Sequence, residues 1–199
     1  MKEFYRRHLP HWQPKGTVFF VTFRLKNSLP YEVIKSLRDE WGRADQNALD
    51  EQHYFEKWEE YLDKAEFGPC WLSQPEIAGI VKEAIHYRDG KVFNLHTYCI
   101  MPNHVHVVFE PLSKSESDSD LLPLNKILQS LKRHTARQAN RNLGRERAFW
   151  QDESYDRVIR NQEEYIRTIN YVLKNPVNAG FVSQWEEWQW TYCKPDIFS

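Results

Sequence analysis

The sequence predicts an α+β domain in which helices pack on one face of an antiparallel sheet. Short runs rich in β-branched and aromatic residues alternate with longer amphipathic segments along the chain. The two most strand-like runs, 92–100 and 104–109, are joined by Met101-Pro102-Asn103, which predicts a hairpin. The length of 199 residues suits one domain, or one domain with an insertion.

Periodicity and boundary residues predict the elements in order. A strand begins after Gly16, Ser28 and Pro30 open a helix, and Pro75 opens another. In chain order we expect a strand over 17–25, helices over about 28–41, 48–64 and 75–87, strands over 92–100 and 104–109, a polar loop over 113–120, a helix over 123–142, a short strand near 156–160 and a helix over 162–175. The last helix should stop before Pro176, because a proline disfavours helical conformation in the residue before it.

An acidic stretch separates the first strand from the strand pair. Residues 38–66 contain ten Asp and Glu against four Lys and Arg, although the net charge of the whole chain is only −1. We interpret about 42–70 as a helical insertion outside the core, with no assigned role. The chain 1–199 is then one domain that ends in a tryptophan-rich tail, 183–199.

Composition excludes several classes of protein. No apolar run approaches the roughly 20 residues of a membrane span, so no membrane partner is expected. The N-terminal residues lack the apolar segment of a secretory signal. The three cysteines have no CxxC spacing, which favours reduced thiols in the cytoplasm over a disulfide framework or a zinc site.

A basic block points to a polyanionic partner. Residues 124–147 contain seven Lys and Arg against a single Glu. Within the predicted helix 123–142, apolar residues recur at three- and four-residue spacing, and the cations lie on the opposite face. Those cations are Lys126, Arg133, Arg137 and Arg141. Such a face suits nucleic-acid phosphates, although a merely solvated face has the same pattern.

Two histidines share one face of a predicted strand. His104 and His106 are two residues apart, and side chains alternate across a sheet, so both imidazoles point the same way. Such a pair can hold a divalent metal and leave positions open for a substrate. Histidines on a solvated strand face, or one buried structural histidine, would have the same spacing. The next alternate position is Val108, which counts against a histidine-triad hydrolase.

Tyr171 lies away from the apolar stripe of the last predicted helix, with Arg167 and Lys174 within one turn. Because nearby positive charge favours the phenolate, Tyr171 is a candidate nucleophile. A half-exposed surface tyrosine is the ordinary alternative. Asn175 follows four residues later, so its side chain would project beside Tyr171, within reach of the same metal.

Four segments, in this order, resemble the single-tyrosine transposases that act on single-stranded DNA. MPNHVHVVF (101–109) is similar to their histidine–hydrophobe–histidine motif, and YVLKNPVNAGFV (171–182) to their C-terminal tyrosine motif. LPHWQPKGTVFFVTFRL (9–25) and FWQDESYDRVIR (149–160) resemble the REP-associated branch, bacterial relatives associated with repetitive extragenic palindromes. The resemblance covers residues 5–190, approximately.

The resemblance implies a ferredoxin-like or RRM-like core whose sheet carries the histidine pair. It implies Mg²⁺ or Mn²⁺ held by His104, His106 and, by position, Asn175. It implies that Tyr171 is the nucleophile, which forms a 5′-phosphotyrosine link and frees a 3′-hydroxyl. The implied substrate is single-stranded DNA with a hairpin and a short guide sequence beside it.

The expected DNA contacts combine the basic helix with cations near the tyrosine. They are Lys126, Arg133, Arg137, Arg141, Arg145, Arg167 and Lys174. The protein is expected to act as a monomer or homodimer in the bacterial cytoplasm, associated with the nucleoid. Two alternatives stay open at this point. One is a non-catalytic module that binds DNA or RNA hairpins, and the other is a metal-dependent hydrolase that uses water as its nucleophile.

Overall fold

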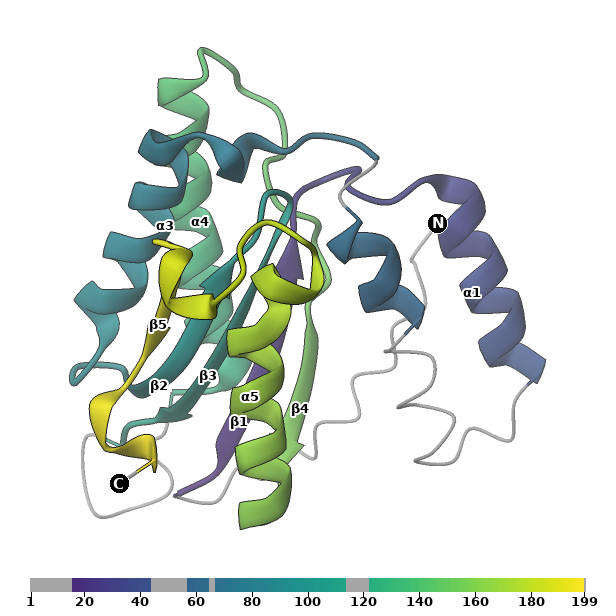
Figure 1. Cartoon of the computed structure of the whole chain (residues 1–199). Helices are drawn as coiled ribbons and strands as arrows, with labels where there is room; N and C mark the ends of the chain where they lie inside the picture. Colours follow the sequence, from purple (N-terminus) through teal and green to yellow (C-terminus); the bar gives the residue numbers. More distant parts are fainter. Residues whose placement is uncertain (1–15, 44–56, 65–66, 114–121, 199) are drawn as a thin grey trace.

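The computed structural model describes residues 16–43, 57–64, 67–113 and 122–198 (Figure 1). Their centre is a five-stranded sheet with the order β4-β1-β3-β2-β5, in which every neighbouring pair is antiparallel. The strands are β1 (Val18–Arg24), β2 (Phe93–Ile100), β3 (His104–Pro111), β4 (Tyr155–Ile159) and β5 (Thr191–Cys193). The predicted hairpin is confirmed as β2 and β3, and β3 is the central strand.

The principal helices are α1 (Tyr31–Arg43), α3 (Pro75–Arg88), α4 (Leu124–Asn142) and α5 (Gln162–Asn178). Helix α3 connects β1 to β2 and α4 connects β3 to β4. With the strand order β4-β1-β3-β2, this is the βαββαβ arrangement of ferredoxin-like domains. The predicted α+β class is therefore confirmed.

Helices cover both faces of the sheet (Figure 1). Alternate side chains of the strands, such as Phe23 and Val107, pack with α3 and α4 in the main core. Phe20 and Val108 point the other way and pack under α5. The prediction that helices cover one face is correct for α3 and α4. It is wrong for α5, which packs on the opposite face. Helix α5 buries its own apolar stripe against the second face, which is apolar enough to receive it.

The predicted end of the last helix before Pro176 is wrong, because α5 continues to Asn178. Asn161 caps the start of the helix, because its side-chain oxygen accepts a hydrogen bond from the Glu164 backbone N–H (2.8 Å). Pro176 removes one backbone donor, but it is itself buried, as is Leu173 one turn earlier. Packing of this turn against the sheet outweighs the local preference, so Asn175 lies in regular helix.

The other boundaries lie within a few residues of their predicted positions, apart from two regions. Of the predicted acidic helix 48–64, residues 57–63 are helical and the earlier part lies outside the described residues. The predicted polar loop lies almost wholly outside them. In the tail, β5 pairs with β2 and was not predicted, because three residues are too few for a periodic signal. None of the described helices has the length and apolar character needed to cross a membrane.

Replacing Phe109 with alanine is expected to lower the free energy of unfolding by about 3–5 kcal/mol, the range for deleting a buried aromatic ring. Phe109 is 1% exposed on the central strand, and its ring centroid lies 4.6 Å from that of Phe93. Chemical denaturation measures the change. Tyr31→Ala is the control, because Tyr31 is 69% exposed on α1 and should change stability little. Equal effects of the two substitutions would contradict the assignment of the core.

Candidate active site

The two histidines lie side by side on the α5 face of β3, and both are fully buried. His104 Nδ1 lies 2.6 Å from Asn103 Oδ1, and His106 Nδ1 lies 2.8 Å from Thr22 Oγ1. These contacts orient both rings, so that the two Nε2 atoms face each other at 2.9 Å. Metal-binding histidines are commonly held in this way through the ring nitrogen that does not bind the metal.

Two carboxylates of the helical segment 57–63 face the histidine pair. Glu59 Oε2 lies 3.0 Å from His106 Nε2, and Asp63 Oδ1 lies 3.4 Å from His104 Nε2. Residues four apart share one face of a helix, as alternate residues do on a strand. One ligand atom from each of the four side chains lies within 4.8 Å of the other three. The four groups are thus placed to hold one metal ion.

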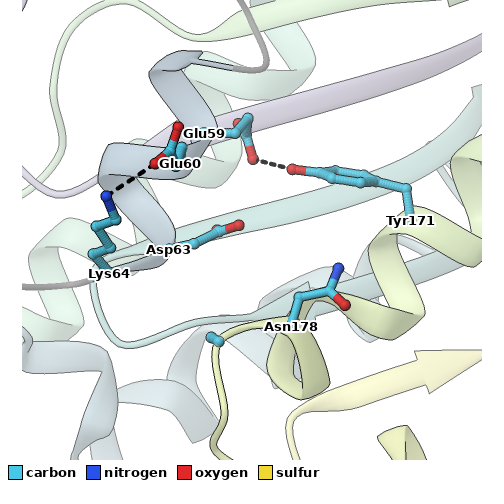
Figure 2. A pocket seen from close by; sticks show the side chains of 7 residues that line it. Glu59, Glu60, Asp63, Lys64, Tyr171 and Asn178 are labelled. Carbon is cyan, nitrogen blue, oxygen red and sulfur yellow. Dashed lines mark hydrogen bonds and ion pairs between the residues drawn. The ribbon is translucent and has the colours of Figure 1, made fainter.

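Helix α5 brings Tyr171 to this cluster. The Tyr171 hydroxyl donates a hydrogen bond to Glu59 Oε2 (2.5 Å), and Figure 2 shows the two side chains meeting between α5 and the helical segment. The Tyr171 ring also stands edge-on to His106, with the centroids 5.5 Å apart. Tyr171 is half-buried. The tyrosine and the histidine pair, which are far apart in sequence, therefore form one site.

Asn175 lies in the same site, one turn after Tyr171, and is fully buried. Its side-chain N–H₂ group points to both oxygens of Asp63, at 3.3 and 3.4 Å. Its Oδ1 atom has no hydrogen-bond partner among the described residues. Glu59 Oε1 is likewise buried without a partner there. Buried oxygens of this kind normally have a hydrogen-bond partner. The lack of one among the described residues leaves both oxygens available to bind a cation.

Burial and charge shift the pKa values of the site in different directions. Burial raises the pKa of Asp63 to about 7, and Glu59 adds to the rise, while His106 and Asn175 oppose it. Burial, and then His106, lowers the pKa of His104 well below its ordinary value. Neutral His104 is the form that binds metals.

The expected electrostatic surroundings of Tyr171 need a correction. Burial, and then the carboxylates of Glu59 and Asp63, raises the pKa of Tyr171 well above its ordinary value. Arg167 and Lys174, expected to favour the phenolate, are exposed on α5, whereas Glu59 contacts the hydroxyl. The acidic segment that supplies this contact lies more than one hundred residues earlier in the sequence, so local helix geometry could not indicate it.

A pocket of about 410 Å³ opens beside Tyr171 between the helical segment and α5 (Figure 2). Its lining residues are Glu59, Glu60, Asp63, Lys64, Tyr171, Asn178 and Ala179. Lys64 pairs with Glu60 at 2.9 Å. Three of the lining residues are acidic and one is basic, so acidic side chains outnumber basic ones in the lining of this pocket.

The predicted DNA-binding cations lie on two sides of the sheet. Lys126, Arg133 and Arg137 of α4 line a second pocket together with Arg88 of α3, in the helix layer opposite the histidine pair. Arg141 is exposed on α4. Arg167 and Lys174 are exposed on α5, on the same side of the sheet as the histidine pair. The two sets of cations therefore lie on opposite sides of the sheet and do not form one continuous basic face.

Arg145 has a different setting. Its guanidinium carbon lies 3.8 Å from the ring centroid of Trp71, and the Trp71 ring stacks on Phe149. Arg145 also donates a hydrogen bond to the Ala148 carbonyl oxygen (3.4 Å). Local packing therefore accounts for part of its position.

Sequence reasoning missed Glu59 and Asp63. Both lie in the acidic stretch, where many carboxylates are expected to be solvated. The available signal was their spacing of four residues beside Trp58 and Leu62, which puts both carboxylates near the apolar side of a helix. That spacing does not say which other element the helix meets.

The fold and the site define an α+β domain of ferredoxin-like topology, with a buried histidine pair facing a tyrosine on a C-terminal helix. In sequence, the chain is similar to the REP-associated tyrosine transposase of Escherichia coli K12. The two are 24% identical over 113 residues, which are 57% of this chain and 62% of the relative. A putative REP-associated tyrosine transposase of Haemophilus influenzae is 22% identical over 110 residues, which are 53% and 61%.

The resemblance to REP-associated tyrosine transposases is thereby confirmed. Each match spans about three fifths of the length of the curated relative. Among solved structures, a REP-associated tyrosine transposase bound to a REP hairpin has a TM-score of 0.49 at 18% identity, over 96% of this chain and 82% of that one. No family model matches the chain.

Proposed function

We propose that the chain is a metal-dependent endonuclease and strand transferase that cleaves single-stranded DNA beside hairpins, with Tyr171 as the nucleophile. One observation supports this most directly. Glu59 Oε2 lies within hydrogen-bonding distance of both the Tyr171 hydroxyl and His106 Nε2, so the nucleophile lies beside the metal ligands. The names of the two curated relatives support the same class of reaction.

The residues present fit a divalent cation. His104 and His106 offer two ring nitrogens, and Asn175 offers a buried oxygen that has no partner among the described residues. A mixed set of nitrogen and oxygen ligands suits Mn²⁺ or Mg²⁺. When bound, such an ion supplies Lewis-acid stabilisation of the charge that gathers on the phosphate oxygens.

The protein groups then account for the remaining requirements of a transesterification. Tyr171 Oη attacks the phosphorus atom, the bond from phosphorus to the 3′-oxygen breaks, and the 3′-oxygen takes up a proton. The hydroxyl proton of Tyr171 leaves along its hydrogen bond to Glu59 Oε2, the acceptor that it contacts. Attachment to helix α5 holds Oη in place, which lowers the entropic cost of reaching an in-line geometry. The phosphotyrosine link retains the energy of the phosphodiester bond that was broken. A 3′-hydroxyl can therefore attack this link later and reverse the step.

The partners and organisation in this proposal extend the same reasoning. The single-stranded substrate, a single catalytic domain over 1–199, a monomer or homodimer, and action in the cytoplasm at the nucleoid are all parts of it. The named relatives are associated with REP sequences, which favours hairpins from repeats beside the gene as first substrates.

An adduct assay tests the proposal. The full chain is mixed with hairpin oligonucleotides that carry a label at the 3′ end, because a 5′-phosphotyrosine link retains the fragment on the 3′ side of the cut. We expect a labelled band at the mass of the protein on a denaturing gel with Mg²⁺ or Mn²⁺, and none with a chelator. Cleavage without an adduct would point to a hydrolase that uses water. Binding without cleavage, over a panel of hairpins, would point to a non-catalytic module.

Replacing Arg133 and Arg137 together with alanine is expected to weaken DNA binding about equally across sequences. Both residues line the α3–α4 pocket and are exposed on α4. Each lost phosphate contact should reduce the slope of log affinity against log salt by about 1. Fluorescence anisotropy over a range of salt measures this slope. Lys35→Ala on α1 is the control, and an unchanged slope in the double variant would contradict a DNA contact on this face.

A further inference from the structure

We propose that Glu59 and Asp63 bind the same divalent ion as His104 and His106, so that the helical segment 57–63 completes the metal centre. This inference rests on the proposed function, which by itself requires only the two histidines and Asn175. It assigns a role to a segment that has none from its sequence. The resulting centre contains two histidines from β3, two carboxylates from the helical segment 57–63 and Asn175 from α5.

The position of the helical segment is built into the fold. Leu62 is fully buried, and its backbone carbonyl accepts a hydrogen bond from Asn103 Nδ2 (3.1 Å). Trp58 packs against the α5 core, with the Arg24 guanidinium 5.9 Å from its ring centroid. Glu59 and Asp63 therefore reach the histidines from a segment that contacts β1, α5 and the β2–β3 turn.

The amide of Asn103 determines where the proton of His104 lies. Since Asn103 Nδ2 donates to Leu62, its Oδ1 atom faces His104 Nδ1 at 2.6 Å and can only accept. His104 Nδ1 must therefore carry a hydrogen, and in a neutral ring Nε2 then holds a lone pair. That lone pair faces His106 Nε2 at 2.9 Å and Asp63 Oδ1 at 3.4 Å.

The site consequently contains more acceptors than donors. Beyond the lone pair of His104 Nε2, the oxygens Glu59 Oε1 and Asn175 Oδ1 are buried and lack a partner among the described residues. With Asp63 ionised, the donors present are one Tyr171 hydroxyl, the Asn175 amide group and at most one proton at His106 Nε2. A cation surrounded by these atoms can accept an electron pair from each of the acceptors at once. A neutral side chain carries too few hydrogens to do the same.

Charge leads to the same conclusion. Glu59 is 2% exposed, and a buried carboxylate is costly unless a positive charge compensates it. One divalent ion balances the two carboxylates. Oxygen ligands from Glu59, Asp63 and Asn175, together with two imidazoles, suit Mn²⁺ or Mg²⁺ better than metals that prefer thiolate ligands. Through its hydrogen bond to Glu59, Tyr171 is then linked directly to a proposed metal ligand, beside the pocket between α5 and the helical segment.

Titration of the metal-free full chain with Mn²⁺ tests the inference without any DNA. Isothermal calorimetry should show one ion per chain. Glu59→Gln and Asp63→Asn keep the side-chain shapes, and each should weaken binding about tenfold or more, with a larger loss in the double variant. Glu60→Gln is the matched control, because Glu60 lies on the same segment, is exposed and pairs with Lys64. It should bind Mn²⁺ as tightly as the wild type.

Melting in a chelator provides the second measurement. If the carboxylates are metal ligands, Glu59→Gln should melt at the same temperature as the metal-free wild type or higher, because a buried charge is gone. If Glu59 instead forms a permanent ion pair with protonated His106, the substitution should lower the melting temperature, since a partner of a buried pair is removed.

The outcomes separate this inference from the proposed function. Wild-type affinity for Mn²⁺ in the double variant, together with loss of binding in His104→Ala, would overturn the inference and leave the proposed function standing. If His104→Ala also bound Mn²⁺ with wild-type affinity, neither the inference nor the proposed function would keep its metal site. A wild-type chain that does not bind Mn²⁺ or Mg²⁺ would also overturn both.

Discussion

Tyr171→Phe is expected to abolish the covalent protein–DNA adduct and to reduce strand cleavage by about 10³-fold or more, the scale for removal of a covalent nucleophile. The substitution removes only the hydroxyl that contacts Glu59. The ring keeps its edge-on contacts with Phe20 and His106, so the fold and the arrangement of the histidine pair should persist. The adduct assay with a 3′-labelled hairpin measures the effect.

Tyr165→Phe is the matched control for this substitution. Tyr165 lies on the same helix, and its hydroxyl contacts His96 Nδ1 at 2.7 Å, away from the histidine pair. Its loss should leave the adduct yield nearly unchanged. An adduct that persists in Tyr171→Phe, mapped by mass spectrometry to another residue, would sink the assignment of Tyr171. Cleavage that persists with no adduct would transfer the role of nucleophile to water.

His104→Ala is expected to weaken Mn²⁺ binding by more than about 100-fold, because the proposed function makes His104 a metal ligand and not merely a residue that orients one. Metal-dependent cleavage should fall with it. His104 is fully buried, so the substitution also leaves a small cavity. Calorimetry reports the affinity, and the thermal melt in a chelator reports separately whether the fold has been weakened.

Two comparisons make the His104 result specific. His134→Ala removes an exposed imidazole of α4 on the opposite side of the sheet and should not alter Mn²⁺ affinity. His106→Ala should reproduce the loss, because the two Nε2 atoms face the same point. Retained affinity in both His104→Ala and His106→Ala would show that the ion binds elsewhere.

Alternation along the strands explains why much of the fold could be predicted. A sheet residue and its second neighbour share a face, so the spacing of His104 and His106 was enough to place them together. The same rule, applied to β1, separates Phe20 from Phe19 and Phe23, and thereby divides the two cores. The amphipathic pattern of α4 likewise predicted which of its residues are buried, including Ile127 and Leu131.

The end of α5 could not be predicted, because its stability is tertiary. The rule that a proline ends a helix describes an isolated chain, in which nothing replaces the missing hydrogen bond. Here burial of Leu173, Asn175 and Pro176 between the sheet and the helical segment stabilises the additional turn. This turn keeps Asn175 in helical register with Tyr171.

The sequence by itself determined the α+β class, the pairing of β2 with β3, the shared face of the two histidines and the resemblance to REP-associated tyrosine transposases. These depend on local periodicity and on short motifs. Only the tertiary structure decided that Glu59 and Asp63 enter the same site and that the basic face of α4 lies on the other side of the sheet. The physical reason is that hydrogen bonds such as Tyr171 to Glu59 join residues 112 apart, and no local preference specifies which distant surfaces meet.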